Sequence, residues 1–204
     1  MTARIEPLRG ANAMAVGRLL ADSHLNYPAY AALWPNPRAR DSALRRYLTA
    51  LARDAASWGD AVLAKDAGRE VGAALWLPPG GFPPSAARKI RLVPVMMRMA
   101  LRSPRSATAL GLLGARMGRQ TRSQPGWYLR AMGVHPESRG RGVGALLLAP
   151  VLARADEEGT PCALHLSDPA MVPYFQRHGF RLAGRELPVR GGVASYLPMV
   201  RLPR

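Results

Sequence analysis

The sequence predicts one mixed α/β domain, and two features of its pattern support that prediction. Short apolar runs with the length of strands alternate with longer segments whose apolar residues recur at helical spacing. A glycine-rich segment, residues 134–144, lies between the apolar run Trp127–Val134 and a helical pattern that opens at Ala145. At 204 residues the chain is long enough for one hydrophobic core, so we expect a single domain over residues 1–204.

The N-terminal part predicts a strand, two helices and a two-stranded hairpin. In order, these elements are expected at 3–8, 11–24, 41–57, 60–65 and 70–77. Asp41 and Ser42 are the expected cap of the second helix. The connection 26–37 is rich in proline and aromatic residues, and prolines disfavour long regular structure there. The hairpin is indicated by the turn sequence Asp66-Ala67-Gly68-Arg69 between its two apolar runs.

Residues 83–124 are the least typical segment of the chain. They contain nine Lys or Arg and no Asp or Glu, with apolar residues at helical spacing. This pattern predicts two basic amphipathic helices separated near Ser103-Pro104. The favoured interpretation is an inserted helical pair that covers the sheet or an acceptor cleft, with its arginines in solvent. The alternative is a membrane-surface element, since basic amphipathic helices bind anionic lipid.

The C-terminal part predicts two helices and three strands around them. A helix is expected from about Gly142 to Glu158, bent at Pro150, where a backbone hydrogen bond is lost. The remaining elements are a strand at 162–167, a short helix at 170–178 and strands at 181–186 and 194–202.

The glycines between strand and helix indicate an anion site. Gly140, Gly142 and Gly144 stand at alternate positions, so the backbone can adopt positive φ and approach a ligand closely. Their amides would point, with the positive end of the following helix dipole, at one place. A P-loop is excluded because no Lys and Ser/Thr follow Gly144, and the third glycine comes one residue early for a dinucleotide fingerprint.

The loop carries a resemblance to a known family. Arg139-Gly140-Arg141-Gly142-Val143-Gly144 fits the pattern Arg/Gln-x-x-Gly-x-Gly/Ala and resembles the acyl-CoA pyrophosphate loop of the GNAT superfamily of N-acyltransferases. Within it, the chain is most similar to the actinobacterial group that includes puromycin N-acetyltransferase, through 74–80, 127–129, 133–134, the loop and 172–180. The resemblance implies a GNAT fold: a mixed, mostly antiparallel twisted sheet of six to seven strands with a splayed strand pair, flanked by helices. In that fold 83–124 is an insert and 127–180 holds the acyl-CoA-binding core motifs.

The same resemblance implies acetyl-CoA as co-substrate and a set of residues that bind it. These are Met132, Gly133, Val134, Arg139, Gly140, Arg141, Gly142, Val143, Gly144, Met171 and Phe175. The backbone of Met132 and Val134 would pair with the pantetheine arm, and the amides of 139–144 would take the pyrophosphate. A primary amine of a small molecule or peptide would then attack the acyl group directly in a ternary complex. Tyr27, Tyr30 and Trp34 either line the acceptor pocket or pack in the core.

The candidate catalytic residues are His165, Tyr174 and Ser167, and here the chain departs from the family. His165 stands where relatives have a glutamate, and Met171 and Phe175 stand where they have an asparagine and the tyrosine that protonates the thiolate. Tyr174 is one residue away and about 100° around the helix, which is expected to point it elsewhere. Two functions therefore stay open: an acetyl-CoA-dependent N-acetyltransferase, or a catalytically degenerate acyl-CoA-binding or regulatory module.

Composition bounds the remaining properties. The formal net charge of +16 favours polyanionic ligands such as CoA, but only two of the 29 basic residues are lysines and no nucleic-acid-binding module is present, so nucleic acid is not an expected partner. One cysteine, Cys162, excludes an internal disulfide, and no metal site is expected. Without a signal-peptide pattern or an apolar run of about 18 residues, we expect a cytoplasmic protein, either a monomer or a homodimer.

Overall fold

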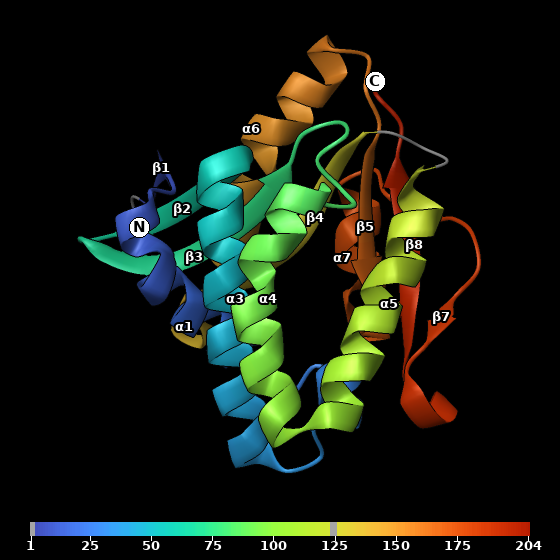
Figure 1. Ribbon diagram of the computed structural model, residues 1–204. Helices are drawn as coiled ribbons and strands as arrows, with labels where there is room; N and C mark the ends of the chain where they lie inside the picture. Colours follow the sequence, from blue (N-terminus) through green and yellow to red (C-terminus); the bar gives the residue numbers. More distant parts are fainter. Residues whose placement is uncertain (1–2, 123–125) are drawn as a thin grey trace.

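A mixed sheet organises the protein (Figure 1). The computed structural model describes residues 3–122 and 126–204, and within them the sheet has eight strands in the order β1-β2-β3-β4-β5-β8-β6, with β7 paired to β8. The strands are β1 Arg4–Pro7, β2 Asp60–Asp66, β3 Arg69–Leu77, β4 Trp127–Val134, β5 Cys162–Leu166, β6 Arg181–Leu182, β7 Leu187–Pro188 and β8 Ser195–Arg201. Only the β4–β5 pair is parallel. The mixed, mostly antiparallel sheet is therefore confirmed.

The expected strand at 181–186 is shorter than predicted. It forms only the two residues of β6, because Gly184 adopts a positive φ of 84° that interrupts the extended backbone. The chain then turns into β7, which the sequence did not predict. This additional strand brings the sheet to eight strands instead of six to seven.

Seven α-helices flank the sheet in the described residues. They are α1 Ala13–His24, α2 Pro28–Leu33, α3 Pro37–Trp58, α4 Ala86–Arg102, α5 Pro104–Arg122, α6 Val143–Glu157 and α7 Val172–Arg177. Short 3₁₀ turns lie at Gly10–Asn12, Pro136–Ser138, Pro169–Met171 and Arg190–Gly192. No helix in the described ranges combines the length and apolarity needed to cross a bilayer.

Two N-terminal helix boundaries differ from the prediction. The connection 26–37 contains α2, because Pro28 occupies the first helical position, where its missing N–H costs no hydrogen bond. Helix α3 begins at Pro37 and not at Asp41, because the Oδ1 of Asn36 accepts a hydrogen bond from the amide of Ala39 at 3.0 Å and caps the helix.

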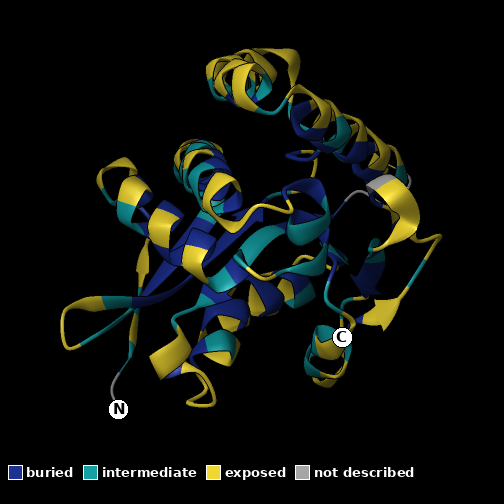
Figure 2. Cartoon of the chain, turned by 90° about the horizontal axis from the view of Figure 1, so that it is seen from below, coloured by how far each residue is buried: buried dark blue, intermediate teal, exposed yellow. Residues whose placement is uncertain are grey.

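Alternation along the strands divides the core into two layers. Leu63 and Leu75 face a cluster that includes α1, α2 and α3, whereas Ala74 and Trp76 face a cluster that includes α6 and Phe175. Figure 2 shows the buried strands between helices whose outer surfaces are exposed. The sheet is therefore covered on both faces.

The predicted basic helical pair is confirmed as α4 and α5, which meet at Ser103. A buried ion pair ties α4 to α3: the Arg88 guanidinium donates to both carboxylate oxygens of Asp54, at 2.9 and 2.5 Å, and to the carbonyl of Gly81 at 2.7 Å. The hydroxyl of Ser106 on α5 donates to the carbonyl of Leu33 at 2.6 Å. These contacts fix the pair against the N-terminal helices.

The expected splayed strand pair is β4 and β5. The two strands pair only at Trp127–Leu129 with Cys162–Leu164, and beyond that point β5 pairs with β8 alone. A bulge lies in β4 at the same place, because Leu129 pairs with Trp76 and Ala131 with Leu75, which leaves Arg130 as the extra residue. The strands therefore separate at Arg130.

Candidate active site

The glycine loop connects β4 to α6 through two residues in the left-handed region. Gly140 has φ of 74° and Gly142 has φ of 80°, a backbone conformation that favours glycine. A Cβ atom on either residue would meet no atom within 4 Å. These two glycines are therefore required by the backbone conformation, and they border open space.

The first turn of α6 presents amides without helical acceptors. Gly142 is the N-cap and supplies no side-chain cap, and the first helical hydrogen bond runs from the Leu146 amide to the Gly142 carbonyl at 3.1 Å. The amides of Val143, Gly144 and Ala145 precede that bond and have no acceptor within the helix. Together with the positive end of the helix dipole, they form a site suited to an anion.

Gly144 has a different role from the other two glycines. A Cβ atom on Gly144 would lie 2.4 Å from the hydroxyl oxygen of Tyr174. That hydroxyl is buried and has no hydrogen-bond partner in the described part of the chain, and burial raises the pKa of Tyr174. Gly144 therefore makes room for Tyr174, which packs on the first turn of α6.

The edge of β4 beyond the bulge faces the opening between the strands. The His135 amide donates to the Val71 carbonyl on β3 at 2.8 Å. Because hydrogen-bonding groups alternate along a strand, those of Val134 and Met132 point away from β3, and the Val134 carbonyl accepts a hydrogen bond from Arg139 Nε at 3.4 Å. Gly133 has a packing role, since a Cβ there would lie 2.1 Å from the hydroxyl of Ser23 on α1.

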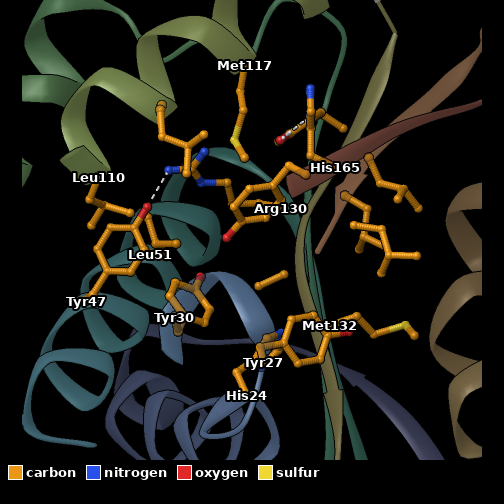
Figure 3. A pocket seen from close by; sticks show the side chains of 18 of the residues that line it. His24, Tyr27, Tyr30, Tyr47, Leu51, Leu110, Met117, Arg130, Met132 and His165 are labelled. Atoms are coloured by element: carbon orange, nitrogen blue, oxygen red, sulfur yellow. Dashed lines mark hydrogen bonds between the residues drawn. The ribbon is translucent and has the colours of Figure 1, made fainter. Parts of the chain in front are cut away.

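A cavity of about 80 Å³ lies where β4 and β5 separate. Figure 3 shows side chains from α1, α2, α3, α5, β4 and β5 converging on it. Its polar lining consists of His24, Tyr27, Tyr30, Tyr47, Tyr128, Arg130, His165 and Tyr196. Of the three aromatic residues in the connection 26–37, Tyr27 and Tyr30 line the cavity. Trp34 is a core residue with 3% exposure.

The predicted site residues divide around this cavity. His165, Phe175 and Met132 line it, whereas Tyr174 and Ser167 are not among its lining residues. Ser167 is 1% exposed, and its buried hydroxyl has no hydrogen-bond partner among the described residues. Burial raises the pKa of Cys162 to about 12, so this thiol is a poor nucleophile at neutral pH.

His165 is held by hydrogen bonds at both ring nitrogens. Gln120 donates its amide to the Arg185 carbonyl at 2.7 Å, so its side-chain oxygen faces His165 Nε2 at 3.0 Å. Nε2 then carries the proton, and Nδ1 accepts from the Tyr128 hydroxyl at 3.0 Å. Burial, with a smaller contribution from Arg130, lowers the pKa of His165 to about 4, so the ring is neutral at pH 7.

The sequence analysis missed Arg130, the cation at the cavity. Its guanidinium donates to the Tyr47 hydroxyl at 2.9 Å (Figure 3). It also lies 4.9 Å from the centre of the Phe82 ring. No carboxylate pairs with it among the described residues, and the titratable groups around it are the neutral hydroxyls of tyrosines. An arginine in the middle of the apolar run Trp127–Val134 was the available signal.

Comparison with known proteins agrees with this geometry. Residues 94–180 match the family model of the Acetyltransferase (GNAT) family. An acetyltransferase structure from Corynebacterium glutamicum has a TM-score of 0.68 at 23% identity, covering 100% of this chain and 98% of that one. A phosphinothricin acetyltransferase from Sinorhizobium meliloti, solved with AcCoA, has a TM-score of 0.56 at 18% identity, covering 100% and 90%. The chain therefore has the fold of GNAT acetyltransferases and is similar to that family in sequence over residues 94–180.

The particular acceptor is not fixed by these relatives. A mycothiol acetyltransferase from Nocardioides sp. is 40% identical over 72 residues, which are 34% of this chain and 24% of that protein. The match therefore spans about a quarter of the curated relative's length. A polyamine N-acetyltransferase from Drosophila melanogaster, with a TM-score of 0.62 at 19% identity and coverage of 98% and 100%, shares the fold.

Proposed function

We propose that residues 1–204 form one acetyl-CoA-dependent N-acetyltransferase domain that acts on a primary amine of a small molecule or peptide. One observation carries this proposal: the amide-rich first turn of α6 lies beside the opening between β4 and β5. An anion site and an unpaired strand edge are the two features that an extended thioester with a diphosphate requires. The proposal includes the similarity of this chain to the puromycin N-acetyltransferase group.

The residues present fit acetyl-CoA. The amides of residues 140–145 and the side chains of Arg139 and Arg141 would bind the phosphates, with Gly140 and Gly142 bordering open space. The strand edge at Met132 and Val134 would orient the pantetheine arm, and a strand amide would polarise the acyl carbonyl. When bound, acetyl-CoA supplies the activated acyl group for direct attack by the amine. No covalent intermediate on Cys162 is needed, in agreement with the raised pKa of that thiol.

The described side chains of this site offer only a weak base for the amine proton and no acid at Phe175 for the departing thiolate. His165, with a pKa near 4, stays neutral and can accept a proton through the Tyr128 hydroxyl, although a base of that strength holds the proton poorly. Phe175 lines the cavity and cannot protonate the departing thiolate. We propose that solvent completes both transfers, and that Tyr174 and Ser167, which do not line the cavity, support the site through packing.

The position of Phe175 also favours the second candidate function, a degenerate acyl-CoA-binding or regulatory module. Such a module would keep the loop and the strand edge but lack turnover. The two functions share the ligand and differ in chemistry. They are therefore separated by measuring binding and thiol release on the same preparation.

The test is calorimetry with CoA on the wild type and on Gly142→Asp. A carboxylate beside the amide site is expected to weaken CoA binding at least tenfold through like-charge repulsion. Gly159→Asp is the matched control, because Gly159 also has positive φ, 62°, with no atom within 4 Å of a Cβ, and lies beyond the opposite end of α6. Equal affinities for all three proteins would refute the site.

Thiol release from acetyl-CoA across a panel of primary amines then tests the chemistry. Release that depends on an amine supports the transferase. Tight CoA binding without release from any amine supports the degenerate module, and activity gained by Phe175→Tyr would show that the missing acid is the cause.

A further inference from the structure

A groove between α4 and α5 adjoins the cavity at the strand opening. It has a volume of about 680 Å³ and shares Tyr47, Leu110, Gly114 and Arg130 with the cavity. Arg130 therefore lies where the two spaces meet. A molecule seated in the groove would reach the predicted site of acyl transfer by passing its guanidinium.

The groove has an apolar floor and a basic border. Leu92, Val93, Met96 and Met97 of α4 face Leu110 and the small residues Gly111, Gly114, Ala115 and Gly118 of α5. Its charged residues are Lys89, Arg119, Arg122 and Arg130. Among the residues that the structure describes, no Asp or Glu lines either the groove or the cavity.

Among the described residues, no carboxylate compensates the charge at Arg130. Arg130 is half-buried, its hydrogen-bond partners are the hydroxyls of Tyr47 and Tyr128, and its guanidinium carbon lies over the Phe82 ring. By contrast, the buried Arg88 is paired with both oxygens of Asp54. A guanidinium has a rigid set of donors that matches a carboxylate, and a desolvated cation next to a cavity favours an anionic ligand.

The separation along β4 limits where the anionic group sits on the ligand. Arg130 precedes Met132 by two residues, about 6.6 Å along a strand, and the Met132 backbone faces the opening where the acyl group is expected. Figure 3 shows the guanidinium of Arg130 turned toward Tyr47, where the groove and the cavity share lining residues. Because Arg130 and Met132 are close neighbours on one strand, the arrangement favours an acid that lies only a few bonds from the reacting amine.

We propose that the acceptor is an apolar α-amino acid whose carboxylate binds Arg130 and whose side chain lies in the groove between α4 and α5. This inference rests on the proposed N-acetyltransferase function. It disfavours polyamines, whose additional positive charges would meet Arg130 and the basic border of the groove. The insert thereby supplies the specificity of the enzyme.

The test compares matched pairs of acceptors with and without the acid. Phenylalanine, tryptophan and leucine are measured beside phenethylamine, tryptamine and isoamylamine in the thiol-release assay with acetyl-CoA. The wild type is expected to favour each acid at least tenfold in kcat/KM when the comparison is corrected for the fraction of neutral amine. Preference for the decarboxylated amines would overturn this inference while leaving the transferase function intact.

Variants of Arg130 then identify the residue responsible. Arg130→Met is expected to lower kcat/KM for the acids more than tenfold, whereas kcat/KM for the amines should stay unchanged or rise. Arg130→Lys should give values between those of Arg130→Met and the wild type. Arg98→Met is the control: it removes one positive charge from a surface that lines neither the cavity nor the groove, and the ratio of acid to amine should persist. CoA calorimetry on each variant confirms that it is folded.

Three outcomes would overturn the inference. An equal loss for acids and amines in Arg130→Met would show a structural role. A higher kcat/KM with an acidic thioester such as succinyl-CoA would show that Arg130 binds a carboxylate on the acyl group. No release with either member of any pair, in a protein that binds CoA, would overturn the transferase function and this inference with it.

Discussion

The contact between Gly144 and Tyr174 leads to a prediction that separates packing from ligand binding in the glycine loop. In Gly144→Ala, the new methyl group would lie 2.4 Å from the Tyr174 hydroxyl oxygen and 3.2 Å from the ring carbon that bears it. Alanine would favour the helix by about 1 kcal/mol over glycine, but overpacking of this kind costs about 1–3 kcal/mol. We expect a net destabilisation of about 0–2 kcal/mol.

Removal of the hydroxyl should relieve most of that cost. Tyr174→Phe deletes a buried hydroxyl that has no partner in the described residues, so by itself it should be neutral or stabilising by about 1 kcal/mol. In the double variant, the nearest remaining atom is the ring carbon at 3.2 Å, which needs only a small shift. The two substitutions should therefore show a favourable coupling of about 1 kcal/mol or more.

The measurement is a double-mutant cycle from urea unfolding, with thermal midpoints as a second readout. For a chain of this size 1 kcal/mol corresponds to roughly 2–4 °C. Gly142→Ala with Tyr174→Phe is the control cycle: Gly142 has φ of 80° and open space around a Cβ, so its cost of about 1–2 kcal/mol is backbone strain that Tyr174→Phe cannot relieve. A coupling near zero at Gly144, or an equal coupling at both glycines, would refute the packing role.

Two further predictions concern stability. Arg88→Met should lower the free energy of unfolding in urea by about 3–5 kcal/mol, because it leaves Asp54 buried without its partner. Arg45→Met, in the exposed pair with Asp41, should lower it by less than about 1 kcal/mol. Equal losses would contradict a stabilising role of the buried Arg88–Asp54 pair. His24 and His165 both have a pKa lowered to about 4, mainly by burial, so the unfolded chain binds more protons below about pH 6.5, and stability should fall from there to about pH 4 by at most about 3 kcal/mol per histidine. His165→Gln should flatten that dependence, and an unchanged slope would show that the ring is protonated in the folded state.

Local chemistry allowed much of the fold to be predicted from the sequence. The bounds of β4, the hairpin of β2 and β3, and the break between α4 and α5 follow from apolar runs and turn residues within a few positions of each boundary. The shared glycine pattern likewise predicted the loop before α6. The wrong predictions at α2 and α3 also have local causes. Pro28 and Asn36 stabilise helix starts within a segment that the sequence analysis interpreted as irregular.

The lining of the cavity could not be predicted in this way. The hydrogen bond between Arg130 and Tyr47 joins residues 83 positions apart, and the one between His165 and Gln120 joins residues 45 apart. Nothing in either local sequence specifies the partner. Similarly, the glycine pattern did not reveal that Gly144 accommodates Tyr174 while Gly140 and Gly142 adopt left-handed backbone.

The bulge at Arg130 explains why one short strand can serve both the predicted cofactor and the proposed acceptor. Tyr128 and Ala131 pack with the cluster of the N-terminal helices, whereas Leu129, Met132 and Val134 pack with the cluster of α6. Regular alternation would place residues 128, 130, 132 and 134 on one face, so the extra residue has shifted the strand by one position. Arg130 thereby stays on the cavity side, while the edge that follows it turns toward α6 and the glycine loop. The same insertion separates β4 from β5, so the opening, the guanidinium and the strand edge are consequences of a single local irregularity that the apolar run Trp127–Val134 conceals.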